Sequence, residues 1–210
     1  MKKIRLLCIT CPRTDLSYHK QVELACQGGT DMIQLRDKNL SDREFLNLSV
    51  ELEAICKRYN VYFTVNNRID IANASGIDGV HIGQSDLPVD YARKILGPTK
   101  IIGLSASNYE QVAQASKQDI DYIGYGAIFA TETKPESQAS GLAALSEIKK
   151  QVNIPLIAIG GIDETNVADV ICAGADGVAV VRAVCGAQDV KKAAENIKKI
   201  ILQAEQEKRN

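Results

Sequence analysis

The stretch Ile154–Val181, IPLIAIGGIDETNVADVICAGADGVAVV, decides the fold. Within it, Leu156–Gly160 and Gly177–Val181 are short apolar runs of the β type, and Glu164–Ala173 between them has the apolar spacing of a helix. Two strands that flank one helix in this way pair in parallel through a right-handed crossover. The stretch therefore predicts a βαβ unit of an α/β fold.

The same alternation runs through the whole chain. Strands are predicted over Arg5–Thr10, Met32–Arg36, Tyr62–Asn66, Gly79–Ile82, Ile101–Ser105, Tyr122–Gly126, Leu156–Gly160 and Gly177–Val181. Helices are predicted over Lys20–Gln27, Asp42–Tyr59, Ile69–Ala74, Val89–Leu96, Tyr109–Ser116, Leu142–Gln151, Glu164–Ala173 and Asp189–Gln206. Such units close naturally into a (β/α)8 TIM barrel, so residues 1–210 are predicted to form a single barrel domain. A doubly wound open sheet is the alternative, because strict alternation also fits that fold.

Composition narrows the class of function. Lys and Arg number 25, and Asp and Glu number 26, so the net charge of -1 offers no basic surface for nucleic acid. No apolar run reaches the ~20 residues of a membrane helix. We therefore expect a cytoplasmic protein with small-molecule partners, and a homo-oligomer is compatible with the sequence. Cys8 and Cys11 form a lone C-x-x-C, which we interpret as reduced, buried thiols and not as a metal or redox site.

The carboxyl ends of the strands carry the active site of a TIM barrel, and the second strand is the most polar there. Gln34 and Arg36 lie two residues apart and share the inward face, which Lys38 continues into the loop. Two cations near the barrel mouth predict an anion site, because Arg and Lys bind phosphate well. A salt bridge to a carboxylate of a neighbouring strand is the structural alternative.

The third and fourth strands add oxygen and nitrogen ligands. Asn66 and Asn67 follow the third strand, where they could bind a ligand or cap the next helix. His81 points inward between Gly79 and Gly83, and we expect these glycines to clear space for a ligand; a core histidine satisfied by its neighbours is the structural alternative. Asp86 lies in the following loop, where a carboxylate near Asn67 and a diphosphate could hold Mg²⁺.

Later loops predict a second anion site. The long segment after the sixth strand contains Thr131, Thr133 and Lys134, and is either a binding loop or an ordinary surface loop. As a binding loop it would add Lys134 to the first anion site, with Arg36 and Lys38. Gly161, in the pair after the seventh strand, lets backbone N–H groups approach an anion, and the residues after Val181 could open a short helix towards the same phosphate. Two anion sites indicate two phosphorylated substrates or one bisphosphate.

These motifs resemble thiamine phosphate synthases over nearly the whole chain. The resemblance rests on QLRDK at 34–38, VNNRIDIA at 65–72, DGVHIGQSD at 78–86, GLS at 103–105, TETKP at 131–135, AIGGI at 158–162 and GADGVAVV at 174–181. It implies a transferase that joins a hydroxymethylpyrimidine diphosphate to a thiazole phosphate, giving thiamine phosphate and pyrophosphate. It also implies a dissociative mechanism, in which pyrophosphate leaves before the thiazole nitrogen attacks.

The resemblance also assigns residues. The pyrimidine diphosphate would be held by Gln34, Leu35, Arg36, Asp37, Lys38, Asn66, Ser105 and Lys134, with His81 nearby. The thiazole phosphate would be held by Thr131, Glu132, Thr133, Gly161, Val181 and Arg182. The implied catalytic residues are Arg36, Lys38, Ser105 and Lys134, and the implied Mg²⁺ ligands are Asn67 and Asp86.

Two positions depart from the family pattern. Asn67 stands where the family usually has Asp, which removes a charge from the metal site, and Arg182 stands where it usually has Ser. A thiazole tautomerase is the first alternative function, although Ser107 stands where a tautomerase would place a catalytic histidine. A non-catalytic phosphate-binding barrel is the second.

Overall fold

A computed structural model describes residues 2–131 and 138–208 of the chain. Its strands are β1 (Leu6–Ile9), β2 (Met32–Leu35), β3 (Tyr62–Asn66), β4 (Gly79–Ile82), β5 (Ile101–Ala106), β6 (Tyr122–Gly126), β7 (Leu156–Ile159) and β8 (Gly177–Val180). Its helices are α1 (Tyr18–Gln27), α2 (Asp42–Arg58), α3 (Ile69–Ser75), α4 (Val89–Leu96), α5 (Tyr109–Ala115), α6 (Gly141–Lys149), α7 (Val167–Cys172) and α8 (Val190–Glu207).

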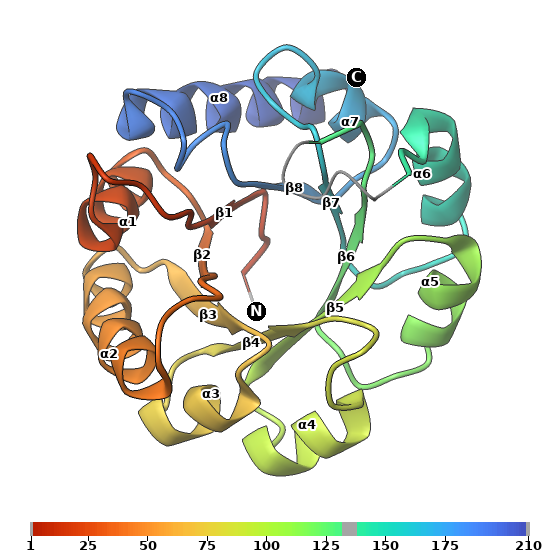
Figure 1. The fold of residues 1–210 in the computed structure, drawn as a ribbon. Coiled ribbons are helices and arrows are strands. Elements are labelled where there is room, and N and C mark those ends of the chain that lie inside the picture. Colours follow the sequence, from red (N-terminus) through yellow and green to blue (C-terminus); the bar gives the residue numbers. More distant parts are fainter. Residues whose placement is uncertain (1, 132–137, 209–210) are drawn as a thin grey trace.

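The strands form one closed parallel barrel in chain order, with the helices around it (Figure 1). β8 pairs with β1, with Leu7 in register with Ala179, which closes the sheet. The predicted TIM barrel is therefore confirmed, and the open sheet is wrong. Within the described part of the chain, no helix combines the length and the apolarity that crossing a membrane requires.

Most predicted element ends agree with the structure, and the helix α7 shows why one end does not. It begins at Val167 instead of Glu164. The side chain of Asp163 accepts hydrogen bonds from the backbone N–H and the hydroxyl of Thr165, and the Asp163 N–H donates to Asn166 Oδ1 (3.0 Å). These local bonds hold residues 163–166 in a turn and delay the helix. The capping box predicted at Ser41 and Glu44 is present at the start of α2.

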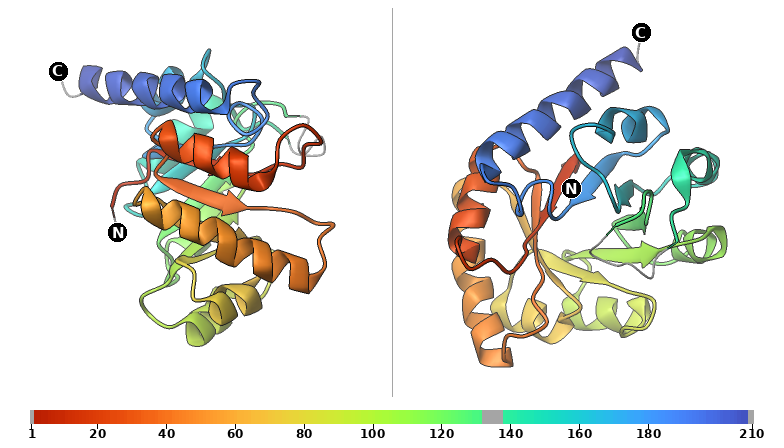
Figure 2. Two further views of the ribbon diagram at one scale, coloured as in Figure 1. Left: turned by 90° about the vertical axis from the view of Figure 1, so that its left-hand side faces the viewer. Right: turned by 45° about the horizontal axis from the view of Figure 1, so that its top comes forward.

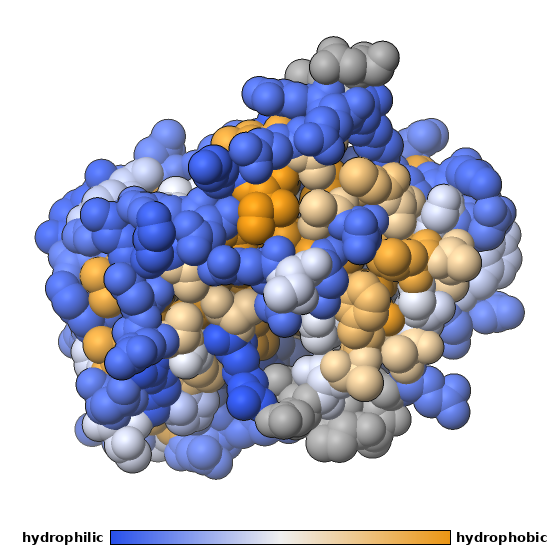
Figure 3. Space-filling view, turned by 90° about the horizontal axis from the view of Figure 1, so that it is seen from above, coloured by the Kyte–Doolittle hydropathy of each residue, from blue (hydrophilic) through white to orange (hydrophobic). Residues whose placement is uncertain are grey.

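Two apolar clusters hold the barrel together. The larger one lies between the sheet and the helices, because alternate strand residues such as Ile33 and Leu35 point outward. The smaller one fills the interior and consists of Ile4, Leu7, Ile9, Met32, Ile101, Tyr122, Ile157 and Ala179. The helices lie around the outside of the barrel (Figure 2), and the face seen from above in Figure 1 carries hydrophilic residues together with an apolar patch near its middle (Figure 3).

A repeated aspartate secures the amino-terminal rim of the barrel. One aspartate directly precedes each even-numbered strand, and its carboxylate accepts a backbone N–H at the start of the strand before. The pairs are Asp31 with Arg5 and Leu6, Asp78 with Phe63, Asp121 with Ile102, and Asp176 with Leu156, all at 2.8–2.9 Å. These bonds satisfy N–H groups that have no ladder partner, and so fix the rim opposite the predicted site.

Candidate active site

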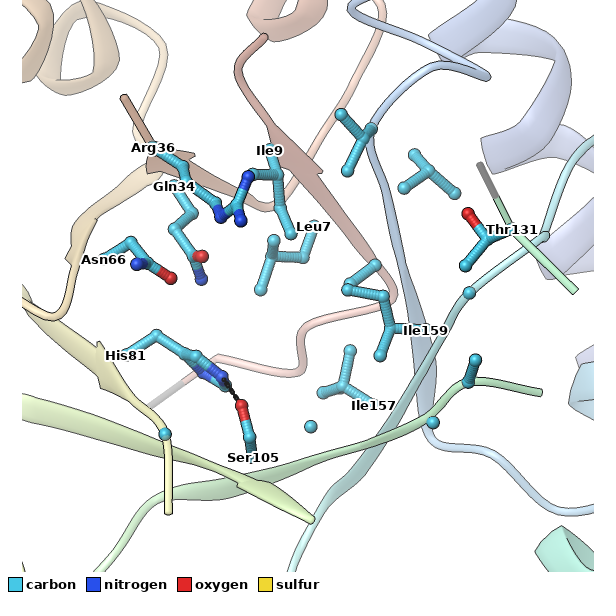
Figure 4. Close-up of a pocket in the computed structure, with 18 of the residues that line it drawn as sticks. Leu7, Ile9, Gln34, Arg36, Asn66, His81, Ser105, Thr131, Ile157 and Ile159 are labelled. Carbon is cyan, nitrogen blue, oxygen red and sulfur yellow. Dashed lines mark hydrogen bonds between the residues drawn. The ribbon is translucent and has the colours of Figure 1, made fainter. Parts of the chain in front are cut away.

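The carboxyl ends of the strands surround a cavity of about 1010 Å³. Most of the predicted site residues line it: Gln34, Arg36, Lys38, Asn66, Asn67, His81, Asp86, Ser105, Thr131, Gly161, Val181 and Arg182. Figure 4 shows polar side chains from β2, β3, β4 and β5 on one side and Thr131 across from them. Apolar side chains of β1 and β7 lie between the two sides. The barrel therefore brings together residues that are far apart in the sequence.

Other predicted residues lie elsewhere. The Leu35 side chain is fully buried between sheet and helices, because it has the outward parity of β2. Asp37 accepts hydrogen bonds from the Tyr18 hydroxyl and the Asn39 N–H, and it faces a separate surface hollow beside α1. Neither side chain is placed to contact a ligand in the cavity. Glu132, Thr133 and Lys134 lie outside the described residues.

The two cations of the β2 side face the cavity without a carboxylate partner. Arg36 is half-buried and Lys38 is exposed, and neither forms an ion pair within residues 2–131 and 138–208. The strand end that carries them is held firmly, since the Arg36 N–H donates to Thr10 Oγ1 (3.1 Å) and the Thr10 N–H donates to the Gln34 carbonyl (3.0 Å). The salt-bridge interpretation of these cations is therefore wrong for the described residues.

A hydrogen-bonded group forms the floor of the cavity. His81 Nδ1 lies 2.9 Å from the Tyr122 hydroxyl, and His81 Nε2 lies 2.8 Å from Ser105 Oγ. The two rings stack, with centroids 5.5 Å apart. Burial raises the pKa of the Tyr122 phenol above its usual range, and a hydrogen bond with the Gln34 side chain opposes that rise. The floor is thus polar and internally satisfied.

The two glycines that flank His81 have different roles. Gly83 lines the cavity, as predicted for space beside a ligand, but Gly79 does not. A Cβ on Gly79 would lie 2.0 Å from the Ile101 carbonyl oxygen, so this glycine serves close packing between β4 and β5 and the prediction for it is wrong. Room for the His81 ring itself comes from Gly124 on β6, whose added Cβ would lie 2.9 Å from His81 Cε1.

The two predicted metal ligands lie at the cavity edge. Asn67 has a left-handed backbone (φ 64°), which asparagine tolerates, and its N–H donates to the His81 carbonyl (2.8 Å). The helix α3 has no side-chain cap, so Asn67 does not serve as one. Asp86 Oδ2 accepts the Gly83 N–H at 2.6 Å, and Oδ1 accepts no hydrogen bond from the described residues.

The turn after β7 has the geometry that only glycine adopts easily. Gly160 and Gly161 have φ angles of 103° and 64°, and a Cβ on Gly161 would lie 2.6 Å from the Ala130 carbonyl oxygen. The Gly160 carbonyl accepts from Phe129 N–H (3.0 Å), and the Gly161 carbonyl accepts from Asn166 Nδ2 (2.9 Å). The turn is therefore packed tightly against the chain that leads to Thr131.

The segment after β8 forms turns and not the predicted short helix. The Cys185 N–H donates to the Val181 carbonyl (2.9 Å), which closes a single turn. Arg13, from the loop after β1, holds this segment by donating from Nη1 to the carbonyls of Cys185 (3.1 Å) and Ala187 (2.6 Å). The structure thus gives Val181 and Arg182 a fixed place beside Gly161 at the cavity.

Three residues at the cavity are not among those predicted from the sequence: Tyr122, Gln84 and Gln111. All three line the cavity, and the Gln84 side chain donates to the Ser105 carbonyl (2.6 Å) while Gln111 accepts from Ser107. Tyr122 could have been found by parity, since it shares the inward face of β6 with Gly124 and Gly126. The two glutamines lie in a loop and a helix, where parity gives no signal.

The expectation of buried thiols holds for Cys8 and is wrong for Cys11. All six cysteines are free; Cys8 is fully buried, whereas Cys11 is half-buried and Cys172 is exposed. Burial raises the pKa of the Cys8 thiol to about 12, so it stays protonated at neutral pH. Within the described ranges, no group of three or more His, Cys, Asp or Glu side chains could hold a metal ion.

Comparison with known proteins gives one consistent result. The family model for thiamine monophosphate synthase matches residues 6–184. The thiamine-phosphate synthase of Clostridium tetani is 44% identical over 178 residues, which is 85% of each chain, and that of Methanoculleus marisnigri is 46% identical over 187 residues, which is 89% of each. A solved thiamine phosphate pyrophosphorylase from Pyrococcus furiosus superposes with a TM-score of 0.90 at 38% identity, covering 96% of this chain and 97% of the other.

Proposed function

Because the chain belongs to the thiamine monophosphate synthase family, we propose how the cavity at the carboxyl ends of the strands serves two substrates. The reaction of this transferase joins a hydroxymethylpyrimidine diphosphate to a thiazole phosphate and releases pyrophosphate. In our proposal the diphosphate binds along β2 and β3, and the thiazole phosphate binds at the turns after β7 and β8. The two reacting groups then meet between these sites.

The observation that carries the proposal is the pair of cations at the end of β2, Arg36 and Lys38, which form no ion pair within the described residues. Arg36 and Lys38 face the cavity, and no carboxylate of the described residues neutralises them. Exposing two cations to a cavity without a partner favours an anionic ligand, and a diphosphate offers the oxygen pairs that Arg binds in bidentate fashion. Asn66 is adjacent, since it follows Val65, which is in register with Leu35 in the β2–β3 pair.

The opposite wall supports a phosphate monoester site. Gly161, Val181 and Arg182 lie there together, and loops after the seventh and eighth strands form the usual phosphate site of these barrels. The Gly160 and Gly161 carbonyls are already hydrogen-bonded within the fold, so an anion meets amide groups rather than unpaired carbonyl oxygens. In this proposal Glu132, Thr133 and Lys134, together with Thr131, complete the two sites.

This arrangement suits a dissociative reaction. Departure of pyrophosphate needs its growing negative charge stabilised, which Arg36 and Lys38 do by charge-assisted hydrogen bonds. The carbocation that remains needs protection from water until the thiazole nitrogen attacks. Leu7, Ile9 and Ile159 line the space between the two walls and supply an apolar surface there. No general base is required.

The proposed Mg²⁺ fits the donor set. Asn67 and Asp86 offer hard oxygen atoms, and Mg²⁺ is typically held by one or two carboxylates together with substrate phosphates and water. Asp86 is oriented by the Gly83 N–H through one oxygen, which leaves Oδ1 for a cation. When bound, the ion would supply positive charge to the diphosphate. The pair lacks the third protein ligand of a dedicated metal site, so we expect the metal to bind well only with the diphosphate.

Direct assay tests the proposal. The protein is incubated with both phosphorylated substrates, with Mg²⁺ or with EDTA, and thiamine phosphate is measured by the fluorescence of its oxidation product. We expect product only when both substrates and Mg²⁺ are present. Absence of product at high enzyme concentration with Mg²⁺ would refute the proposal, and full activity in EDTA would refute its metal.

Asn67→Asp tests the metal site more closely. The added carboxylate charge should lower the Mg²⁺ concentration for half-maximal rate about tenfold, since one more charge near the ion contributes on the order of 1–2 kcal/mol. The measurement is the rate as a function of Mg²⁺ concentration. Asn60→Asp is the matched control, because Asn60 is also left-handed (φ 54°) but lies outside the cavity. An unchanged Mg²⁺ requirement in Asn67→Asp would show that position 67 is not a ligand.

A further inference from the structure

Tyr122, His81 and Ser105 form the hydrogen-bonded floor of the cavity, and the proposed substrate contacts give no reason for Tyr122. Tyr122 lies at the start of β6, deep in the barrel, with 1% of its surface exposed. Its hydroxyl nevertheless joins a connected series of polar groups that reaches the cavity at Ser105. Burying a phenol hydroxyl there is unfavourable unless it is fully hydrogen-bonded, so the arrangement requires a specific partner for each atom.

Glycines on neighbouring strands make room for both rings of the floor. Gly103 pairs with Tyr122 in the β5–β6 register, and a Cβ on Gly103 would lie 2.1 Å from Tyr122 Cζ. Gly124 likewise leaves room for the His81 ring, because an added Cβ would lie 2.9 Å from His81 Cε1. The stacked rings therefore have little freedom to move, and their hydrogen bonds are fixed in place.

The direction of these hydrogen bonds follows from the burial of the Tyr122 hydroxyl. Among the described residues, His81 Nδ1 is its hydrogen-bond partner, at 2.9 Å. If the hydroxyl accepted a proton from Nδ1, its own buried proton would have no acceptor, so the hydroxyl donates to His81 Nδ1. His81 must accept at Nδ1, so in its neutral form it carries its proton on Nε2 and donates to Ser105 Oγ at 2.8 Å. The hydroxyl proton of Ser105 is left to point into the cavity.

We propose that Tyr122 is a positioning residue that holds His81 in the Nε2–H tautomer and thereby keeps Ser105 as a hydrogen-bond donor to the bound pyrimidine diphosphate. The ligand in this inference rests on the proposed function; the tautomer does not. Without the Tyr122 hydroxyl, His81 can place its proton on Nδ1 instead. Nε2 then accepts from Ser105 and turns the serine proton away from the cavity.

Nitrogen NMR of the histidine rings tests the tautomer without substrate. The chain has only two histidines, and His19 is exposed, so His19→Gln assigns the signals. We expect His81 of the wild type in the Nε2–H form at pH 8, and a shift towards Nδ1–H in Tyr122→Phe. A wild-type ring in the Nδ1–H form, or no change in Tyr122→Phe, would overturn the inference. Because no substrate is used, this outcome is independent of the synthase assay.

Kinetics test the link to Ser105. Tyr122→Phe should lower kcat about tenfold, the size of one lost hydrogen bond to a charged ligand, and leave KM for the thiazole phosphate unchanged. Ser105→Ala should have a similar effect, and the double variant should be hardly worse than either single one, since both remove the same donor. Multiplying losses would overturn the inference. Tyr125→Phe is the control, because Tyr125 is equally buried on β6 but packs against the helices.

Discussion

Arg36→Ala is expected to lower kcat/KM for the pyrimidine diphosphate by about a hundredfold to a thousandfold, the usual effect of removing one preorganised donor from developing negative charge. Arg36 is half-buried at the end of β2 and has no carboxylate partner in the described part of the chain. Its loss therefore removes a ligand contact without leaving an unpaired acid. KM for the thiazole phosphate should stay nearly unchanged, which steady-state kinetics with each substrate varied in turn will measure.

Two further variants serve as controls for Arg36→Ala, one for position and one for charge. Arg43→Ala removes an exposed arginine of α2 outside the cavity and should have no effect on either substrate. Arg36→Lys keeps the charge but not the two-pronged donor, so it should recover only part of the rate. Equal losses for both substrates in Arg36→Ala would show that the cavity is not divided into the two sites we propose.

The fold could be predicted from the sequence because the strands and helices carry local signals, such as apolar runs, turn residues and helix caps. The run Leu156–Ile159 is apolar and bounded by Pro155 and Gly160, and the capping box at Ser41 marks a helix start. Element ends were harder, as α7 shows, because they depend on which side chain captures a backbone N–H. Closure of the barrel followed from the number of units and not from any single residue.

The alternation of side chains along a strand predicts which residues face the cavity. Inward parity on β2 separates Gln34 and Arg36 from Leu35, and the structure agrees. Parity cannot tell which residues of different strands meet, because that depends on the stagger of the strands around the barrel. The importance of Tyr122 therefore appears only when its register with Gly103 and its contact with His81 are known.

Gly161→Ala is expected to raise KM for the thiazole phosphate by about 30- to 100-fold, which corresponds to losing charge-assisted hydrogen bonds worth roughly 2–3 kcal/mol. The added methyl group would lie 2.6 Å from the Ala130 carbonyl oxygen and 2.7 Å from Phe129 Cβ. The Ala130 carbonyl is backbone and cannot rotate away like the end of a flexible side chain. The turn at Gly161 and the segment from Phe129 to Thr131 must therefore move apart. Both line the proposed phosphate site.

Gly76→Ala separates this displacement from simple backbone strain. Gly76 is also left-handed (φ 73°), but a Cβ there meets nothing within 4 Å and the residue lies outside the cavity. Gly76→Ala should lose about 1 kcal/mol of stability from the left-handed conformation alone, and Gly161→Ala should lose more because its methyl group also meets the backbone at Ala130, both measured by thermal unfolding. Only Gly161→Ala should weaken thiazole phosphate binding, because only there does the methyl group displace the turn. A normal KM for the thiazole phosphate in Gly161→Ala would place that phosphate elsewhere in the cavity, and the proposed division into two anion sites would then fail.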